Sequence, residues 1–371
     1  MKIAIVSDSI YPYHKGGKET RIFELSTRLA KAGNDVHIYT MKWWDQPGRI
    51  RKENGVTLHA ISRKYKLYSG GRRSMVQGVL FGVACFRLLS EPFDVVDVDH
   101  MPYFPLFSMW IVCRLKRKPM TATWHEVWGG SYWRDYLGHL GFIASLLERL
   151  TVRIPDHIVA VSEFTAERLE TILHSQKPIT WIENGIDTAA IRRLKPSKQT
   201  SDVVFVGRLL SHKNVDVLIR AVAILTRKRP DITCLIISDG PERPQLERLS
   251  AKMGVSDNIV FTGFIEHDVD KFRLMKASRV FAHPSTREGF GIVALEALAC
   301  GLPVVTTNHP ENAARYMITP EIGRICKPTP QSLARAIESV LNDQDLRDTT
   351  EVARSFDWRV SARALEKVYA R

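Results

Sequence analysis

Short apolar runs alternate with helical patterns along the whole chain, and this alternation constrains the fold more than any other feature. In the first half, apolar runs of four or five residues are separated by segments such as 20–32 and 140–152, whose apolar residues recur at helical spacing. Strands that alternate with helices are typical of a doubly wound parallel sheet. We therefore predict strands at 2–6, 35–39, 56–60, 95–98, 120–123 and 157–161.

The second half repeats this pattern after a polar, proline-containing stretch at 195–201 that is typical of a linker. Strands are predicted there at 203–206, 233–238, 259–262, 280–282 and 303–306. The fold class is therefore α/β, with two Rossmann-like doubly wound domains that face a cleft, where ligands of α/β proteins usually bind. The predicted domains are 1–190 and 191–355, followed by an amphipathic helix within 356–371.

The formal net charge of +13 on 371 residues predicts an anionic partner, which leaves nucleic acid, a membrane surface and a phosphorylated substrate open. Basic stretches at 63–73 and 114–118 fall in the first domain. The apolar segment 101–113 is too short to span a bilayer, but the basic residues that follow it keep a peripheral contact with an anionic membrane open.

Five cysteines, an odd number at wide spacing, form no Cys-x-x-Cys pair and argue against a disulfide framework or zinc site. They predict a reducing compartment, the cytoplasm. The apolar run at the N-terminus ends at Asp8, which favours a strand over a signal peptide.

The segment from Ser285 to Gly301 carries the strongest chemical signal. It holds Glu288 and Glu296 on either side of a Gly289-Phe290-Gly291-Ile292 step, where a loop turns into a helix. A helix N-terminus offers unpaired N–H groups and partial positive charge, which suit a phosphate. We expect one glutamate at the reacting centre and the other on a ribose.

Two basic residues follow the first strand of the second domain. Arg208 stands in Gly207-Arg208-Leu209, and Lys213 comes five residues later. A guanidinium and an ammonium at a strand end can neutralise a diphosphate without a metal ion. Surface charge on a loop is the simpler reading of this pair alone.

Three further loops in the first domain are candidates. Gly16-Gly17 precedes a helix and allows backbone N–H groups to approach a phosphate, although a Gly-Gly pair is usually only a turn. His125 follows a strand and can bond a sugar hydroxyl, with flat aromatic faces beside it for sugar stacking at Trp124, Trp128 and Trp133. Asp97-Val98-Asp99 resembles a metal-binding pattern, but it closes a strand and is read as structural.

Together these motifs resemble glycosyltransferase family 4, retaining enzymes with the GT-B fold. The resemblance covers nearly the whole chain and includes Asn184-Gly185-Ile186-Asp187 near the hinge, where Gly185 is expected to have a positive φ. One departure is Asn308-His309-Pro310-Glu311, where the family often has a Gly-Gly-x-x-Glu loop.

The resemblance implies retaining transfer from a nucleotide-diphosphate sugar with no metal and no other cofactor. Glu288 and His125 would then act near the donor sugar as catalytic residues. Donor-binding residues would be Gly17, Arg208, Lys213, Phe264, Ile265, Gly289, Phe290, Gly291, Ile292 and Glu296. The C-terminal helix would return to the first domain, and the acceptor would be a glycan, a lipid-linked molecule or a small molecule.

Two other enzyme classes share this fold, nucleotide-sugar epimerases and sugar phosphorylases. The usual phosphorylase chemistry needs a lysine placed for a cofactor Schiff base, and we identify none in the sequence. A basic nucleic-acid-binding protein is the alternative from another class, but the sequence shows no recognisable binding module.

Overall fold

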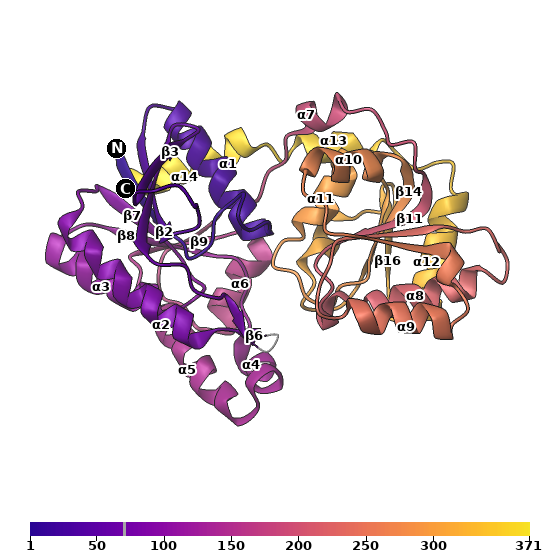
Figure 1. Cartoon of the computed structure of the whole chain (residues 1–371), viewed down its shortest axis with the longest axis horizontal. Coiled ribbons are helices and arrows are strands. Elements are labelled where there is room, and N and C mark those ends of the chain that lie inside the picture. Colours follow the sequence, from indigo (N-terminus) through magenta and orange to yellow (C-terminus); the bar gives the residue numbers. More distant parts are fainter. Residues whose placement is uncertain (70–71) are drawn as a thin grey trace. The chain divides into compact units, whose positions relative to one another are not determined.

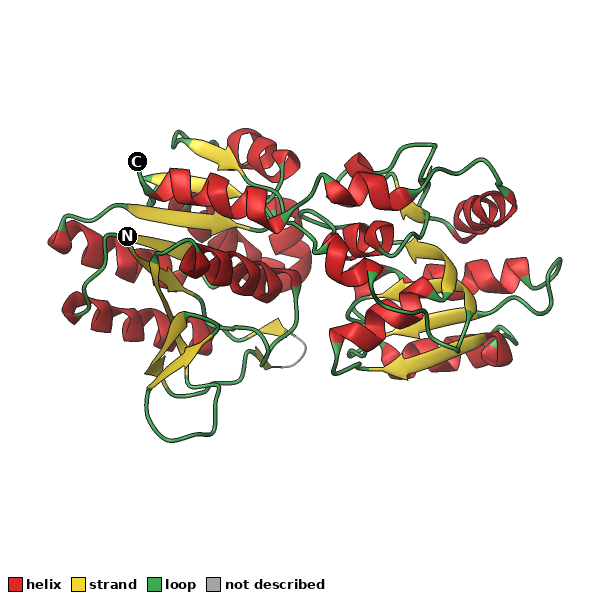
Figure 2. Cartoon of the chain, turned by 90° about the horizontal axis from the view of Figure 1, so that it is seen from above, coloured by secondary structure: helices red, strands yellow, loops and turns green. Residues whose placement is uncertain are grey.

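The computed structural model describes residues 1–69 and 72–371; residues 70 and 71, inside the basic stretch 63–73, lie outside the described residues. The chain divides into two compact units. The first domain comprises Met1–Gly185 with Trp358–Arg371, and the second comprises Ile186–Asp357. Each is a sheet flanked by helices, as Figures 1 and 2 show.

The sheet of the first domain has eight strands in the order β10-β9-β8-β7-β1-β2-β4-β3. Its neighbours pair in parallel except for the antiparallel β3 and β4. Every residue of β1 after Lys2 is buried, as expected for a central strand covered on both faces. The strands are β1 (Lys2–Val6), β2 (Asp35–Met41), β3 (Ile50–Glu53), β4 (Val56–Ser62), β7 (Val95–Asp99), β8 (Met120–Trp124), β9 (His157–Ala160) and β10 (Ile179–Trp181), with β5 (Tyr68–Ser69) and β6 (Arg72–Arg73) forming a separate ribbon.

Helices cover both faces of this sheet. The chain moves one way along the sheet from β1 to β2 and the opposite way from β4 to β7, β8 and β9, so right-handed crossovers place the intervening helices on opposite faces. Figure 1 shows this division, with α1 and α14 on one side and α2, α3 and α5 on the other. The helices are α1 (Gly17–Lys31), α2 (Met75–Ala84), α3 (Phe104–Lys116), α4 (Gly129–Leu137), α5 (Gly141–Thr151), α6 (Glu163–Thr171) and α14 (Trp358–Tyr369).

The second domain is built on a six-stranded, entirely parallel sheet in the order β13-β12-β11-β14-β15-β16. Its strands are β11 (Ser201–Val206), β12 (Cys234–Ile237), β13 (Ile259–Gly263), β14 (Ser278–His283), β15 (Val304–Thr307) and β16 (Gly323–Cys326). Its helices are α7 (Thr188–Arg192), α8 (Val215–Leu225), α9 (Arg243–Lys252), α10 (Asp268–Lys276), α11 (Ile292–Ala299), α12 (Pro330–Asn342) and α13 (Thr349–Arg354).

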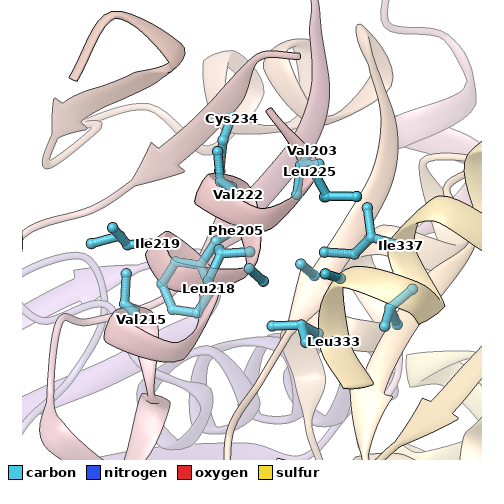
Figure 3. Close-up of a cluster of buried hydrophobic side chains, with 14 of the residues drawn as sticks. Val203, Phe205, Val215, Leu218, Ile219, Val222, Leu225, Cys234, Leu333 and Ile337 are labelled. Atoms are coloured by element: carbon cyan, nitrogen blue, oxygen red, sulfur yellow. The ribbon is translucent and has the colours of Figure 1, made fainter. Parts of the chain in front are cut away.

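The core of the second domain lies between its sheet and the helices α8 and α12. Val203 and Phe205 on β11 pack with Leu218 of α8 and with Ile337 of α12, and all four side chains are fully buried (Figure 3). Thr329 caps α12 by accepting the amide of Ser332, and the apolar residues of that helix then recur on one buried face.

The chain enters and leaves the second domain at one place, because the amide of Ile186 donates to the carbonyl of Phe356. The polar stretch at 195–201 therefore belongs to the second domain and does not connect the two domains. The segment just before this polar stretch is held by Lys276, whose ammonium donates to the carbonyls of Ile191, Arg192 and Leu194.

The C-terminal helix α14 packs against α1 in the first domain. Tyr369 donates its hydroxyl to Asp97 at 2.6 Å, and Ser361 donates to the carbonyl of Glu183. The expected positive φ at Gly185 is wrong. A glycine is needed there because a side chain would lie 2.3 Å from the backbone nitrogen of Trp358.

Candidate active site

Glu288 stands at the centre of a charged cluster in the second domain. Its Oε1 lies 2.5 Å from the Lys213 ammonium and 2.9 Å from His283 Nε2. Lys213 belongs to the single turn η3 (Ser211–Lys213) after β11, and His283 is the last residue of β14. Burial would raise the pKa of Glu288, but Lys213 and His283 lower it well below its ordinary value. Glu288 is therefore an ionised carboxylate at neutral pH.

The backbone of Glu288 is fixed by the loop that follows β15. Its amide donates to the carbonyl of Glu311, and its own carbonyl accepts the amide of Ala313. Asn312, which is fully buried, anchors that loop by donating to Thr306 and Thr307. The segment that lacks the family's usual glycines thus forms a backbone clamp on Glu288, a role that we did not predict.

The predicted loop-to-helix step is confirmed, since α11 begins at Ile292 directly after Gly291. Gly291 has a φ of +89°, and a side chain on it would lie 2.5 Å from Cβ of Ala314. Phe290 is buried against Phe356, so its side chain packs the core and only its backbone is left for a ligand. Gly289 lies in the loop before this turn. The amide of Ala294 donates to the carbonyl of Gly291, so the amides left without a partner inside the helix are those of Ile292 and Val293, its first two residues.

Glu296 lies in the second turn of α11 and forms a second buried ion pair. Both of its carboxylate oxygens lie 2.9 Å from the ammonium of Lys271, which comes from α10. Burial would lower the pKa of Lys271, but Glu296 raises it, so the ammonium stays charged. Lys271 is a partner of this expected ribose ligand that the sequence analysis missed.

The remaining donor-side candidates follow the carboxyl ends of β11 and β13, at the same edge of the parallel sheet as the loop after β14. Arg208 is exposed just beyond β11. Phe264 is 61% exposed and Ile265 half-buried after β13. Asn214 connects the β11 and β14 loops by donating to the carbonyl of Pro284 and to Thr286. The Lys213 ammonium pairs with Glu288 in this structure, and its expected role as a phosphate ligand stays a prediction.

The first domain places a second set of charges at the carboxyl ends of β1 and β7. Lys18, next to Gly17 in the first turn of α1, lies 2.9 Å from Asp8 and also pairs with Asp99. Arg73 pairs with Asp8 as well, at 3.0 Å. Burial would raise the pKa of Asp8, but Arg73 and Lys18 lower it to about 2, whereas burial raises the pKa of Asp99 to about 6. The sequence feature that could have predicted this cluster is the pair of aspartates, Asp8 and Asp99, at the carboxyl ends of β1 and β7.

His125 lies beside this cluster, with Nε2 3.6 Å from Oδ1 of Asp99. It lines a small pocket together with Arg21, Asp97 and Tyr369. Burial, with nearby positive charge, lowers its pKa well below the ordinary value, so the ring is neutral. A neutral imidazole can accept a hydrogen bond from a sugar hydroxyl or donate one to it.

The expected stacking role of the three tryptophans is not supported by the structure. Trp124 is fully buried, and Trp128 and Trp133 are only 8% and 6% exposed. Glu148 organises the latter two by accepting the amide of Trp128 and the indole N–H of Trp133. Their faces pack the core of the first domain because α5 covers them.

The Asp-x-Asp pair divides into two separate roles. Asp97 accepts hydrogen bonds from Thr123 and Tyr369 inside the domain, while Asp99 pairs with Lys18. Among residues 1–69 and 72–371, no group of three or more His, Cys, Asp or Glu side chains is arranged to hold a metal ion.

Comparison with known proteins identifies both halves of the chain. Residues 187–353 match the model of glycosyl transferases group 1, and residues 15–190 match that of glycosyltransferase family 4. The gpi3 subunit of phosphatidylinositol N-acetylglucosaminyltransferase from Schizosaccharomyces pombe is 26% identical over 98% of this chain and 79% of its own length.

Solved structures agree on the fold. Sucrose-phosphate synthase from Thermosynechococcus elongatus superposes with a TM-score of 0.81 at 20% identity, over 100% of this chain and 98% of its own. HepE of Anabaena, solved with UDP and glucose, gives 0.75 at 19% identity over 100% and 99%. The chain is a glycosyltransferase of family 4 with the GT-B fold.

Proposed function

We propose that the enzyme takes its sugar from a UDP- or GDP-sugar and transfers it with retention of configuration, without a metal ion. The observation that supports this proposal most strongly is the arrangement around Glu288. This residue is a buried, ionised carboxylate in the loop just before α11, whose N-cap is Gly291. Breaking the bond between sugar and phosphate leaves an oxocarbenium-like sugar and a negative diphosphate. A site for this reaction needs a carboxylate near the positive sugar and positively charged groups near the diphosphate.

Three groups of the second domain fit the leaving diphosphate. Arg208 offers a planar fork of donors, Lys213 an ammonium, and the first turn of α11 a set of backbone amides. When donor binds, Lys213 exchanges part of its pairing with Glu288 for the diphosphate. The complex of HepE with UDP and glucose supports a nucleoside diphosphate as the ligand of such a fold.

Glu288 then faces the sugar as the charge that stabilises its positive centre, and Glu296 takes the ribose hydroxyls. His125, neutral and 15% exposed at its side chain, is assigned to a hydroxyl of the transferred sugar. Phe264 and Ile265 are assigned to the base. Retention is inferred from the family resemblance of these motifs.

The acceptor is proposed to be a lipid-linked molecule, a glycan or a small molecule. The Schizosaccharomyces pombe relative is named for transfer of N-acetylglucosamine to phosphatidylinositol, which favours the lipid-linked class. Five free, buried cysteines are in keeping with a reducing compartment such as the cytoplasm.

The proposal is tested by incubating the protein with UDP- and GDP-sugars in the presence of a chelator. Slow hydrolysis of the matching donor should release the nucleoside diphosphate and a free sugar. Proton NMR of the first-released sugar, before mutarotation, should show the anomeric configuration of the donor. Inversion would overturn retention, and a strict need for added metal would overturn the metal-free site.

A further inference from the structure

One layer of helices in the first domain carries an unusual concentration of exposed apolar side chains. Of the 26 large apolar side chains exposed among the described residues, 15 lie between positions 75 and 150. They belong to α2, α3, α5 and the short turns η1 (Cys85–Ser90) and η2 (Gly138–Leu140). Single exposed apolar residues are ordinary, whereas a contiguous group marks an interaction surface.

The helix α2 exposes apolar side chains on its outward side. Val76, Val79 and Val83 are 69%, 41% and 61% exposed, while Gln77, Gly78, Phe81 and Gly82 face the domain. The outward side of a surface helix in a water-soluble domain is normally polar. The helix α2 is thus apolar on both sides, with Phe81 in the core and its valines in solvent.

The helix α5 also exposes apolar side chains on its outward side. Phe142, Ile143 and Leu146 are 76%, 52% and 47% exposed. Its inner side carries Ser145 and the fully buried Glu148, whose carboxylate accepts the hydrogen bonds that order the tryptophan loop. Polar contacts therefore hold the inward-facing side of α5 against the domain. Its apolar side is not used for packing inside the domain and can contact another surface.

These helices share one face of the sheet. The right-handed connections from β4 to β7, β8 and β9 put α2, α3 and α5 in one layer, and Figure 1 shows them together on the side away from α1. The first two pack closely, because a side chain on Gly82 would lie 2.8 Å from Cβ of Phe104. Trp110, Ile111 and Leu115 of α3 extend the exposed apolar surface. We call this surface the apolar helix face.

The charges around the apolar helix face are mostly positive. Within 75–90, 104–118 and 138–153, all of which the structure describes, the one acidic residue is the buried Glu148. The basic side chains in these segments are Arg87, Arg114, Lys116, Arg117, Lys118, Arg149 and Arg153. Some have local partners, since Arg114 lies 3.7 Å from Asp156 and Lys118 lies 3.5 Å from Asp94.

A pocket at the end of α3 brings three of these basic residues together. Arg114, Arg117 and Lys118 line it with the exposed Trp110, and Asp156 supplies the single acidic wall. An indole beside clustered cations fits the boundary between acyl chains and phosphate head groups.

We propose that the apolar helix face docks the first domain on a bilayer that contains anionic lipid. The outward side chains of α2 and α5 insert at the level of the head groups, and the basic residues bind lipid phosphates. An apolar surface alone would also suit a protein partner, but the excess of basic over acidic residues around it favours an anionic lipid surface. The inference deepens the proposed function by bringing the enzyme to a lipid-linked acceptor, yet docking needs neither donor nor acceptor.

Co-sedimentation of the full chain with vesicles tests this proposal. We expect binding to phosphatidylcholine vesicles that contain phosphatidylglycerol, weak binding to phosphatidylcholine alone, and loss of binding at high salt. The combined changes Val79→Ser, Val83→Ser and Phe142→Ser should weaken binding roughly 100-fold, because three inserted side chains are lost. All three are exposed, so circular dichroism should show an unchanged fold.

A charge variant and two matched controls make the test specific. Arg114→Gln, Arg117→Gln and Lys118→Gln together should weaken binding roughly 100-fold. Two control variants carry the same number of changes at exposed positions outside the apolar helix face, and both should bind vesicles as the unchanged protein does. The charge control combines Arg227→Gln, Arg248→Gln and Lys252→Gln, and the apolar control combines Val260→Ser, Val269→Ser and Val360→Ser.

Three results would overturn the proposal. They are no binding to either vesicle, equal losses in test and control variants, and a dimer in sedimentation velocity that the serine variants abolish while vesicle binding persists. The last would make the face a contact between copies. Because no sugar donor is present, failure of this test leaves the proposed transferase reaction standing, and success does not establish it.

Discussion

The Glu288 carboxylate lies 2.5 Å from the Lys213 ammonium, and both side chains are largely buried in the second domain. Taken with His283 on its other side, this contact keeps Glu288 ionised while removing it from bulk water. The negative charge of a buried, paired carboxylate can stabilise a positive charge that develops on the sugar. Because it is ionised, this carboxylate has no proton to donate. We therefore propose an electrostatic role for Glu288.

Replacing Glu288 with glutamine should reduce turnover by roughly 10²–10⁴-fold, the range for loss of an acid/base-type group. The amide keeps the shape of the side chain but removes the charge that stabilises the sugar. Steady-state rates of donor turnover measure the effect. The surface change Glu338→Gln, which removes a carboxylate paired with Lys228, is the matched control and should leave turnover unchanged. Full activity in Glu288→Gln would remove Glu288 from the mechanism.

The Lys213–Glu288 pair should make stability depend on acid pH. Because the folded state lowers the pKa of Glu288, the stabilisation is complete above the ordinary pKa of 4.5 and is lost as pH falls below it. Lys213→Met should lower the free energy of unfolding at neutral pH by about 3–5 kcal/mol, as expected for breaking a buried pair, and should flatten its fall below pH 4.5. Urea unfolding at a series of pH values measures both. Identical pH curves for the two proteins would contradict the pairing.

Lys271 and Glu296 should act as one unit in donor binding. If Glu296 binds the ribose, Glu296→Gln should weaken nucleoside diphosphate binding roughly tenfold or more, the value of one hydrogen bond to a charged group. Lys271→Met should have a similar effect, because it leaves the Glu296 side chain without its anchor. The double variant should then lose little more than either single one. Additive losses would show that the pair does not act on a shared ligand group.

Gly291 should tolerate no side chain. Gly291→Ala imposes a positive φ on alanine and pushes its Cβ to 2.5 Å from Ala314, which should cost more than the 1–3 kcal/mol or so of backbone strain alone. Gly254 is the control, since its φ is also positive but an added Cβ meets nothing within 4 Å. Denaturant unfolding should show a larger loss for Gly291→Ala than for Gly254→Ala. Equal losses would mean that the loop at Ala314 yields.

Local sequence pattern predicted most of the strands and the start of α11, because apolar periodicity and glycine placement act over a few residues. It missed the edge strands β3, β10 and β16 and the short ribbon of β5 and β6. The pairs Lys213–Glu288 and Lys271–Glu296 could not be predicted, since each joins side chains from different loops or helices whose orientation depends on the completed sheet. The tryptophans illustrate the same limit. Their aromatic faces were visible in the sequence, but Glu148 and α5 decide that they are buried.

We propose that the second domain binds a nucleoside diphosphate through Arg208 and Lys213. Isothermal titration calorimetry with UDP and GDP, in the presence of a chelator, tests it most directly. We predict saturable binding of one of them, weakened roughly tenfold or more in Arg208→Ala, in line with one lost charged hydrogen bond. Binding that requires metal, or that is unchanged in Arg208→Ala and Lys213→Ala, would show that these two side chains do not form a metal-free diphosphate site.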